Sequence, residues 1–229
     1  MLTLENVSKI YQNPFISDDR ILVLRGIELS LGNKELDFII GSSGSGKTTF
    51  LKLITGIESP TTGKIIFNDI QIDKIKRKEK IKFWRKHIGF VYQDPRSNLI
   101  SDFNVERNVL LPMKILNELS HEQQKKHMKE LLDFVGLPGY EKRNITTLSG
   151  GEQQRVAVCV GIANNPDLFL ADEPTGELDS NNAEKIISLF RSISTSQETL
   201  GIIVTHNISL INETDSVFIM NKGLLYKKT

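Results

Sequence analysis

Short stretches of alternating apolar and polar residues mark the beginning of the chain. Residues 2–7 and 27–31 follow this pattern, which is typical of strands that are half exposed to solvent. Residues 168–171 form a continuous apolar run, as expected of a strand that is buried on both faces. Further strands are predicted at residues 36–40, 64–68, 88–92, 201–205 and 217–220, the last of which begins a closing hairpin.

Longer segments between these strands have the periodicity of helices. Helices are predicted at residues 47–57, 105–116, 121–135, 149–164 and 181–194. Because strands and helices alternate, we expect an α/β fold with a largely parallel sheet and helices on both of its faces. Between residues 94 and 147 the periodicity is mainly helical, which predicts an inserted helical subdomain.

The composition fits one sizeable domain. The 229 residues include 29 Lys and Arg against 28 Asp and Glu, and this near-neutral balance gives no reason to expect nucleic acid as a partner. The single cysteine, Cys159, excludes an intrachain disulfide and suits a reducing cytoplasm. We find no signal peptide and no apolar stretch of the roughly 20 residues that a bilayer requires. If the protein works at a membrane, another chain is therefore expected to supply the spanning helices.

A glycine-rich loop follows the strand predicted at residues 36–40. It fits the pattern G-x-x-x-x-G-K-[ST] of nucleotide-binding loops, which stand between a strand and a helix, as here. The loop amides wrap the phosphates, Lys47 neutralises the β and γ groups, and the Thr48 hydroxyl binds Mg²⁺. A Gly/Ser-rich turn that carries a lysine by chance is the alternative, and this context argues against it. The predicted nucleotide-binding residues are Gly41, Ser42, Ser43, Gly44, Ser45, Gly46, Lys47, Thr48 and Thr49.

Two carboxylates follow the apolar run at residues 168–171. Asp172 and Glu173 would lie at the carboxyl end of a buried strand, where open α/β sheets bind their ligands. We expect Asp172 to hold Mg²⁺, directly or through water, and Glu173 to orient or deprotonate the water that attacks the γ-phosphate. A solvated turn is the alternative, and the phosphate loop in the same chain argues against it.

A second anion-binding surface is predicted at residues 148–155. Ser149, Gly150 and Gly151 enter a helix there, and backbone N–H groups at a helix start, with the helix dipole behind them, favour a phosphate. One chain with two phosphate sites indicates a protein that closes on ATP as a pair, in which each subunit caps the nucleotide of the other.

In the order and spacing of its motifs, the chain resembles a subunit of the ATP-binding cassette (ABC) family. These motifs are residues 41–48, residues 148–155, residues 170–174 and His206. The resemblance covers essentially the whole chain. The run Ser-Gly-Gly-Glu-Gln-Gln-Arg is the signature of that family, and P-loop kinases and GTPases lack it. A kinase or GTPase is therefore not expected.

The family implies a P-loop NTPase (RecA-like) core with a mostly parallel sheet, an N-terminal antiparallel β subdomain and an inserted helical subdomain. It implies one domain over residues 1–229. Within it, residues 1–93 and 156–229 would form the β subdomain and the core, and residues 94–155 would form the helical subdomain with the signature.

The resemblance also implies roles for individual residues. Tyr11 would stack on adenine, Gln93 would contact Mg²⁺ and the attacking water, and His206 would contact the γ-phosphate; structural or surface roles are the alternatives. Asp179 lies in a loop that would cross the dimer seam. The nucleotide of the partner subunit would be bound by Ser149, Gly150, Gly151, Glu152 and Gln153. The expected catalytic residues are Lys47, Gln93, Glu173 and His206, and the expected Mg²⁺ ligands are Thr48, Gln93 and Asp172.

The implied function is that of an ATPase subunit that dimerises around Mg-ATP, as a homodimer or heterodimer with a second ABC ATPase subunit. It would drive transport through a separate transmembrane permease, as a cytoplasmic protein peripheral on the inner face of the membrane. Residues 105–109 and 172–180 resemble lipoprotein-release and macrolide-export ATPases, whereas the longer loop at residues 93–99 resembles peptide-import ATPases. A soluble ABC ATPase of the iron–sulfur assembly type is the alternative. The cargo and the direction of transport stay open.

Some residues stand apart from these motifs. Asp37 interrupts an apolar strand, and because an unpaired buried carboxylate is costly, we expect it near the strand end or paired. Nucleic acid or anionic lipid are conceivable ligands of the basic run at residues 74–86, but a solvated helix anchored by Phe83 and Trp84 is favoured. Cys159 is expected to be buried on the signature helix. The remaining histidines, expected to be solvated, are His87, His121 and His127.

Overall fold

The computed structural model describes residues 1–12, 20–32, 36–196 and 198–228. The helices are α1 (Lys47–Ile54), α2 (Arg77–His87), α3 (Val105–Leu116), α4 (His121–Phe134), α5 (Gly150–Ile162) and α6 (Ser180–Ser196). The strands are β1 (Leu2–Gln12), β2 (Arg20–Leu31), β3 (Leu36–Ile40), β4 (Thr62–Phe67), β5 (Ile70–Gln71), β6 (Ile88–Val91), β7 (Leu168–Asp172), β8 (Leu200–Thr205), β9 (Ser216–Asn221) and β10 (Leu224–Lys227).

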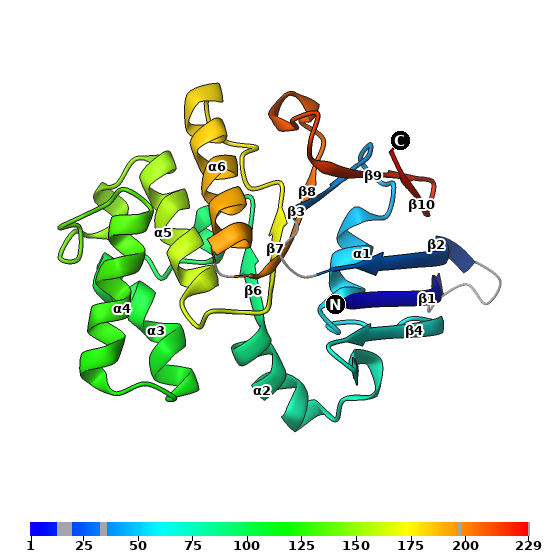
Figure 1. Ribbon diagram of the computed structural model, residues 1–229, viewed down its shortest axis with the longest axis horizontal. Coiled ribbons are helices and arrows are strands. Elements are labelled where there is room, and N and C mark those ends of the chain that lie inside the picture. Colours follow the sequence, from blue (N-terminus) through cyan, green and yellow to red (C-terminus); the bar gives the residue numbers. More distant parts are fainter. Residues whose placement is uncertain (13–19, 33–35, 197, 229) are drawn as a thin grey trace.

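The strands form two sheets. One sheet has the order β2-β1-β4-β5 and is antiparallel, and the other has the order β10-β9-β3-β8-β7-β6. In the second sheet every neighbouring pair is parallel except the β9–β10 hairpin. The expected mostly parallel core with an N-terminal antiparallel sheet is thus confirmed. Figure 1 shows the antiparallel sheet on one side of the molecule, α3, α4 and α5 on the other, and the parallel strands between them.

The parallel sheet divides the core into two halves. In β7, Phe169 and Ala171 face the half that contains α3 to α6, whereas Leu168 and Leu170 face the half that contains α1 and the antiparallel sheet. This period of two is the geometry of a strand, and all four side chains are fully buried. The continuous apolar run seen in the sequence therefore marks a central strand with both faces covered, as expected.

The helical part of the chain consists of α3 and α4, which pack on each other and on α5 (Figure 1). Cys159 of α5 is completely buried in this cluster, as expected. The boundary expected between residues 155 and 156 falls inside α5, which is continuous through that point. The division of the chain into subdomains at that residue stays a prediction.

Several element ends differ from the sequence prediction. The helix predicted to reach residue 57 ends at Ile54, because Gly56 has a φ of 68°, which a helix does not continue. The first strand runs to Gln12 rather than to residue 7. Register shifts against β2 begin after Leu4, and Asn6 has a φ of 48°. Such bulges interrupt the alternation on which the prediction depends.

Asp37 is the second residue of β3 and is completely buried, so its position near the strand start agrees with the prediction. His121 is exposed, as expected. In contrast, His87 and His127 are partly buried, because His87 Nδ1 pairs with Asp167 and His127 lies on the inner side of α4 near Glu130. No helix within the described ranges has both the length and the apolar character needed to cross a bilayer.

Candidate functional site

The loop between β3 and α1 depends on its glycines. Gly44 and Gly46 have φ angles of 75° and 112°, in the region that favours glycine. A Cβ at Gly41 would lie 2.4 Å from the Met220 carbonyl oxygen of β9, which is closer than any real contact. The loop can therefore pass against β9 and enter α1 only with glycine at these positions.

Lys47 is the first residue of α1, and its side chain folds over the loop. Its Nζ donates to the Gly41 carbonyl oxygen at 2.8 Å and to the Ser42 carbonyl oxygen at 3.0 Å. The ammonium group, the loop amides and the positive end of α1 thus concentrate positive charge at one place. Such an arrangement suits the phosphates of a nucleotide.

A pocket brings this loop together with residues from distant parts of the sequence. It is lined by Val23, Ser43, Gly44, Gly46, Lys47, Thr48, Thr49, Gln93, Asp172, Glu173 and His206. Gln93, Asp172, Glu173 and His206 lie at or just beyond the carboxyl ends of β6, β7 and β8, the edge at which parallel sheets bind ligands. Val23 of β2 was not predicted, because nothing distinguishes it in sequence from other apolar strand residues.

Asp172, the last residue of β7, is a candidate metal ligand. Burial raises its pKa above the ordinary value, the charge of Glu173 raises the pKa further, and Lys47 opposes both effects. The described residues contain no group of three or more His, Cys, Asp or Glu that could hold a metal by themselves. Mg²⁺ commonly needs only one or two carboxylates, together with hydroxyl groups, waters and substrate phosphates. The oxygens of Thr48, Gln93 and Asp172 fit that requirement.

Glu173 has an unusual conformation for a residue other than glycine. Its φ is 50°, and its backbone N–H donates to the Val204 carbonyl oxygen at 2.8 Å. The carboxylate accepts a hydrogen bond from the His206 backbone N–H at 3.1 Å, and the His206 ring Nδ1 lies 2.9 Å away. These two contacts orient the Glu173 carboxylate beside the His206 ring. Backbone strain of this kind persists where the surroundings hold it.

Gln93 follows β6 and rests against a glycine of a later loop. A Cβ at Gly176 would lie 2.9 Å from Gln93 Nε2, so a larger residue there would displace the glutamine. One residue earlier, the Tyr92 carbonyl oxygen accepts a hydrogen bond from Gln154 Nε2 of α5 at 3.1 Å. This contact joins the signature helix to the strand that carries Gln93. The sequence placed Gln154 in the signature and Gly176 in the loop after β7, but it did not predict these contacts, because they join residues that are distant along the chain.

The predicted second phosphate surface forms the start of α5. Ser149 caps the helix, and its N–H and Oγ–H both donate to Glu152 Oε2 at 2.8 Å. The Tyr140 hydroxyl donates to Glu152 Oε1 at 2.7 Å. The hydrogen bond from Tyr140, followed by those from Ser149, lowers the pKa of Glu152 to about 2. The residues predicted to act on a partner's nucleotide, Ser149 to Gln153, do not line the pocket that contains Lys47.

These hydrogen bonds to Glu152 lead to a testable prediction about pH. Because the pKa of Glu152 is near 2 in the folded chain against 4.5 ordinarily, its ionised form stabilises the fold above pH 4.5, and that contribution is lost as the pH falls toward 2. Tyr140→Phe is expected to lower stability at neutral pH and to flatten the fall of the thermal unfolding midpoint across this range. Tyr226→Phe, at an exposed residue, is the control; equal curves for wild type and Tyr140→Phe would contradict the prediction.

Asp179 serves as the cap of α6. Its carboxylate accepts hydrogen bonds from the Asn182 backbone N–H at 3.0 Å and from Asn182 Nδ2 at 2.6 Å, and these bonds lower its pKa. The side chain of Asn182 also lies beside Gly151, where a Cβ would approach it to 3.1 Å. The first turn of α6, which Asp179 caps, thus lies beside the signature within one chain. Its expected role at a dimer seam stays a prediction.

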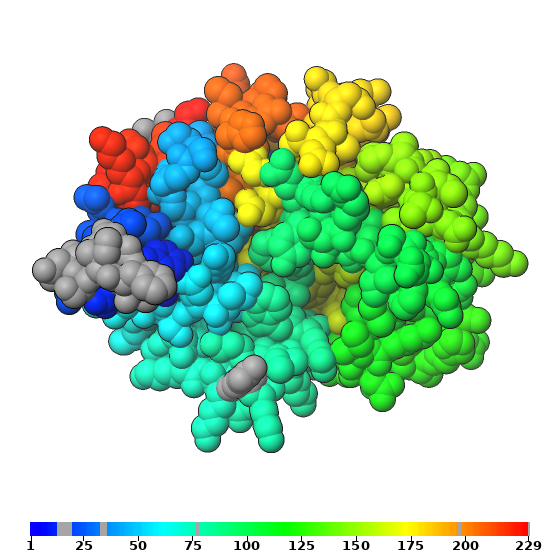
Figure 2. All heavy atoms as spheres, turned by 180° about the vertical axis from the view of Figure 1, so that it is seen from behind, coloured from blue at the N-terminus to red at the C-terminus, as the bar shows by residue number. Residues whose placement is uncertain are grey.

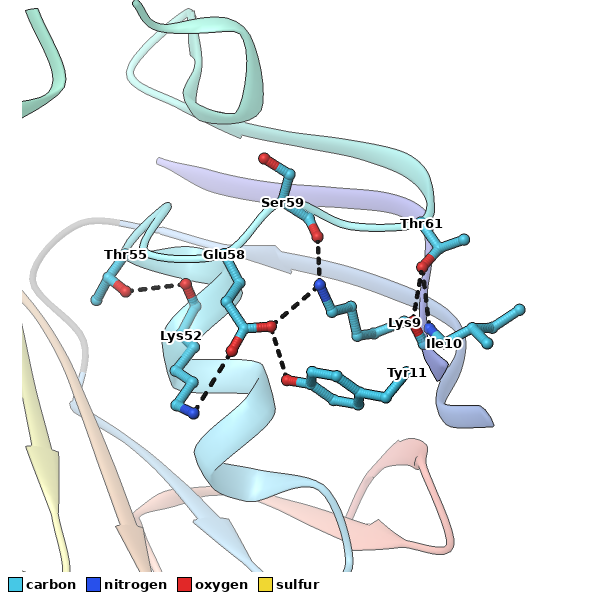
Figure 3. A network of polar contacts seen from close by, with 8 residues as sticks. All are labelled: Lys9, Ile10, Tyr11, Lys52, Thr55, Glu58, Ser59 and Thr61. Atoms are coloured by element: carbon cyan, nitrogen blue, oxygen red, sulfur yellow. Dashed lines mark hydrogen bonds and ion pairs between the residues drawn. The ribbon is translucent and has the colours of Figure 1, made fainter. Parts of the chain in front are cut away.

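Tyr11 lies beside the pocket rather than in its lining. Its hydroxyl donates to Glu58 Oε2 at 2.7 Å, and Lys9 Nζ lies 3.0 Å from the same oxygen and 5.0 Å from the tyrosine ring centroid. Lys52 of α1 pairs with the other Glu58 oxygen at 3.4 Å. Figure 3 shows these side chains converging on the carboxylate. Burial and Glu58 raise the pKa of Tyr11, while Thr49, a pocket residue, lowers it. Tyr11 is thereby fixed next to α1, and adenine stacking stays a prediction.

The sequence of this chain is similar to sequences of known proteins over most of its length. Residues 24–176 match the family model described as ABC transporter. The lipoprotein-releasing system ATP-binding protein LolD of Wigglesworthia glossinidia brevipalpis is 38% identical over 228 residues, covering 100% of this chain and 97% of the relative. LolD of Colwellia psychrerythraea is 42% identical over 203 residues, which cover 89% of this chain and 78% of the relative.

Solved structures of two related proteins have the same fold as this chain. The dimeric post-hydrolysis state of the ATP-binding cassette MJ0796, bound to ADP and Pi, has a TM-score of 0.87 at 32% identity and covers 100% of this chain and 98% of that chain. CbiO1 of Clostridium perfringens, part of the ABC transporter complex CbiONQ, has a TM-score of 0.87 at 27% identity and covers 98% and 86%. The chain belongs to the ABC transporter family, as one of its ATP-binding and ATP-hydrolysing subunits.

Proposed function

We propose that the chain hydrolyses Mg-ATP in the pocket between the 41–48 loop and the carboxyl ends of β6, β7 and β8. The observation that carries this proposal is the composition of that pocket, which is lined by Lys47, Asp172, Glu173 and His206 together. The positive groups suit the phosphates, and the acidic groups suit a metal ion and an attacking water. The same pocket therefore has the parts needed for binding and for hydrolysis.

Lys47 and the loop amides would hold the β and γ phosphates. The Thr48 hydroxyl, the Gln93 amide oxygen and the Asp172 carboxylate would hold Mg²⁺, which neutralises negative charge on the phosphates. The raised pKa of Asp172 reflects a buried carboxylate that a cation would stabilise in its ionised form. Tyr11, fixed by Glu58, would offer its ring to the adenine.

Glu173 would accept the proton of the attacking water. Its carboxylate is oriented by the backbone N–H and the ring of His206, and it is largely buried, whereas His206 is largely exposed. General base catalysis requires a group within hydrogen-bond reach of the attacking water, and Glu173 lines the pocket in which that water would lie. His206, with its ring exposed in the pocket, would contact the γ-phosphate.

A second ABC subunit would complete the site. Ser149, Gly150 and Gly151 lie at the start of α5 and outside the pocket of their own chain, so they would cap the nucleotide of a partner. The MJ0796 cassette bound to ADP and Pi is described as dimeric, which supports this arrangement. ATP bound between two subunits stabilises the pair, and hydrolysis removes that stabilisation.

A membrane-spanning partner protein would be driven by this cycle of ATP-dependent pairing and hydrolysis. The relatives are named for lipoprotein release, and CbiO1 is described as part of a transporter complex; they give no support to a role in iron–sulfur assembly. By analogy, this chain would work as a cytoplasmic subunit, peripheral on the inner face of the membrane, with a separate transmembrane permease.

A groove between α2, α3 and α5 is the proposed docking place for a cytoplasmic segment of the permease. Its lining includes Phe90, Asn98, Leu111, Ile115 and Val160. Asn98 Nδ2 donates to the Phe90 carbonyl oxygen at 2.7 Å, and its Oδ1 accepts from the Tyr92 N–H at 2.9 Å. A segment that moves Asn98 would therefore move the strand end that carries Gln93.

Substitution of the second phosphate surface tests the paired mechanism. In Ser149→Arg, a bulky side chain would occupy the space of the partner's γ-phosphate. We expect ATP binding by the monomer to persist, ATP-dependent dimerisation to be lost, and hydrolysis to fall by about 10²-fold or more, the usual cost of losing a transition-state donor. Fluorescent nucleotide binding, light scattering and phosphate release measure the three quantities.

Ser192→Arg is a matched control, because Ser192 is exposed on α6 and does not line the nucleotide pocket. Its dimerisation and hydrolysis should equal those of the wild type. A Ser149→Arg protein that hydrolyses ATP at the wild-type rate as a monomer would overturn the paired mechanism.

A further inference from the structure

Positive charge is concentrated in one segment of the chain. Residues 74–86 contain eight basic residues and a single acidic residue, Glu79, so the segment has a net charge of 8 − 1 = +7 in a chain whose net charge is +1. The basic residues are Lys74, Lys76, Arg77, Lys78, Lys80, Lys82, Arg85 and Lys86. Most of this segment is helix α2.

Helix α2 is attached to the core by two aromatic residues, as the sequence predicted. Phe83 is buried and packs edge-on against Phe67 of β4, with 6.2 Å between ring centroids. Trp84 is partly buried, and its indole N–H donates to the Thr55 carbonyl oxygen. These contacts fix the rotation of the helix about its axis and therefore decide which side chains face outward.

The outward side is not uniformly polar. Ile81 is 49% exposed, and Ile57, from the loop after α1, is 54% exposed. The two isoleucines line one shallow hollow together with Lys80, Trp84 and Arg85. We call these five residues the α2 face. An isolated exposed apolar residue is ordinary on a protein surface, but here two isoleucines and an indole share one hollow with two cations.

Further cations continue the α2 face along the helix. Lys78, Ile81, Lys82 and Arg85 follow the spacing of three, four and seven residues that places side chains on one side of a helix, and all four are exposed. Lys76, just before the helix, is exposed as well. An apolar centre is thus surrounded by positive charge.

The α2 face is separate from the nucleotide pocket. None of the residues that line that pocket belongs to α2. Figure 1 shows α2 at the lower edge of the molecule, and Figure 2, seen from behind, shows the same segment protruding at that edge. The α2 face therefore stays accessible when nucleotide is bound.

We propose that the α2 face binds the surface of an anionic phospholipid bilayer. Isoleucine and tryptophan side chains enter the interfacial region of a membrane, while lysine and arginine remain at the level of the headgroups through their long stems. Each cation near an anionic leaflet adds to the attraction. A nucleic acid would use the cations but not the two isoleucines, so the apolar centre favours lipid over RNA or DNA. The contact would hold the subunit against the membrane beside the groove proposed for the permease, with which the α2 face shares Trp84 and Arg85.

Vesicle binding of the whole chain tests this proposal. In co-sedimentation, we expect binding to vesicles that contain phosphatidylglycerol and little binding to phosphatidylcholine alone, with release at high salt. Replacing three exposed cations together, Lys76→Gln, Lys78→Gln and Lys82→Gln, should lower the partition coefficient by about tenfold or more. Ile81→Ser should lower it by about threefold or more without a change of charge.

A second triple variant removes the same charge elsewhere. Lys125, Lys126 and Lys129 are exposed on α4, and their replacement by Gln should leave vesicle binding nearly unchanged. ATP hydrolysis should persist in every variant, because none of these residues lines the nucleotide pocket; this activity also verifies folding.

Four outcomes would overturn the proposal. The first two are an absence of vesicle binding and equal binding to neutral and anionic vesicles. The third is an equal loss of vesicle binding in the two triple variants. The fourth is a preference for single-stranded RNA over anionic vesicles, with RNA binding unimpaired in Ile81→Ser. The last two would indicate diffuse charge attraction or a polyanion site rather than a membrane surface.

Discussion

The Glu173→Gln variant is expected to bind ATP normally, to hydrolyse it about 10²- to 10⁴-fold more slowly, and to remain dimeric in ATP. Loss of a general base has this effect on rate. Glutamine has nearly the same shape, and its amide oxygen can still accept the His206 backbone N–H that Glu173 accepts at 3.1 Å. The fold and the nucleotide pocket should therefore survive. Phosphate release at saturating ATP measures the rate, and size-exclusion chromatography in ATP measures the dimer.

Glu177→Gln serves as the comparison, because Glu177 is exposed in the same loop and does not line the pocket. Its rate and its elution should match those of the wild type. Unimpaired hydrolysis by Glu173→Gln would remove Glu173 from the mechanism, and slow hydrolysis without an ATP-stable dimer would separate catalysis from pairing.

Lys47→Ala is expected to weaken ATP binding roughly ten- to 150-fold, since a hydrogen bond to a charged group contributes about 1.5–3 kcal/mol. In the structure, Lys47 Nζ lies within hydrogen-bond distance of the Gly41 and Ser42 carbonyl oxygens of the phosphate loop. Hydrolysis should also fall at saturating ATP, because the same charge would stabilise the transferring phosphoryl group. Titration with a fluorescent ATP analogue and phosphate release measure the two effects.

Lys52→Ala provides the control on the same helix. Lys52 is solvent-accessible and pairs with Glu58 at 3.4 Å, away from the pocket lining. It should retain ATP affinity within a few-fold. If Lys47→Ala binds ATP as tightly as Lys52→Ala does, the 41–48 loop is not the phosphate site.

Much of the fold could be predicted because its signals are local. Helix α3 has the predicted ends, 105 and 116, since Asn104 and Asn117 provide a cap and a stop that are visible in the sequence. The strand β7 was recognisable from its apolar run. The lengths of β1 and β2 could not be predicted from the sequence. Their bulges depend on how the two strands pair with one another and on which residues adopt φ angles above zero.

The sequence by itself determined the chemistry of this protein: the phosphate loop, the acidic strand end and the signature are contiguous motifs, and each carries its own physical requirement. Only the tertiary structure decided which of these groups meet. The order of the parallel strands places Gln93, Asp172, Glu173 and His206 beside Lys47. The packing of the antiparallel sheet and α2 around α1 holds Tyr11 against Glu58 and leaves Ile57 and Ile81 exposed together. Such contacts join residues that are far apart along the chain. They arise from strand order and packing, which no local pattern of residues specifies.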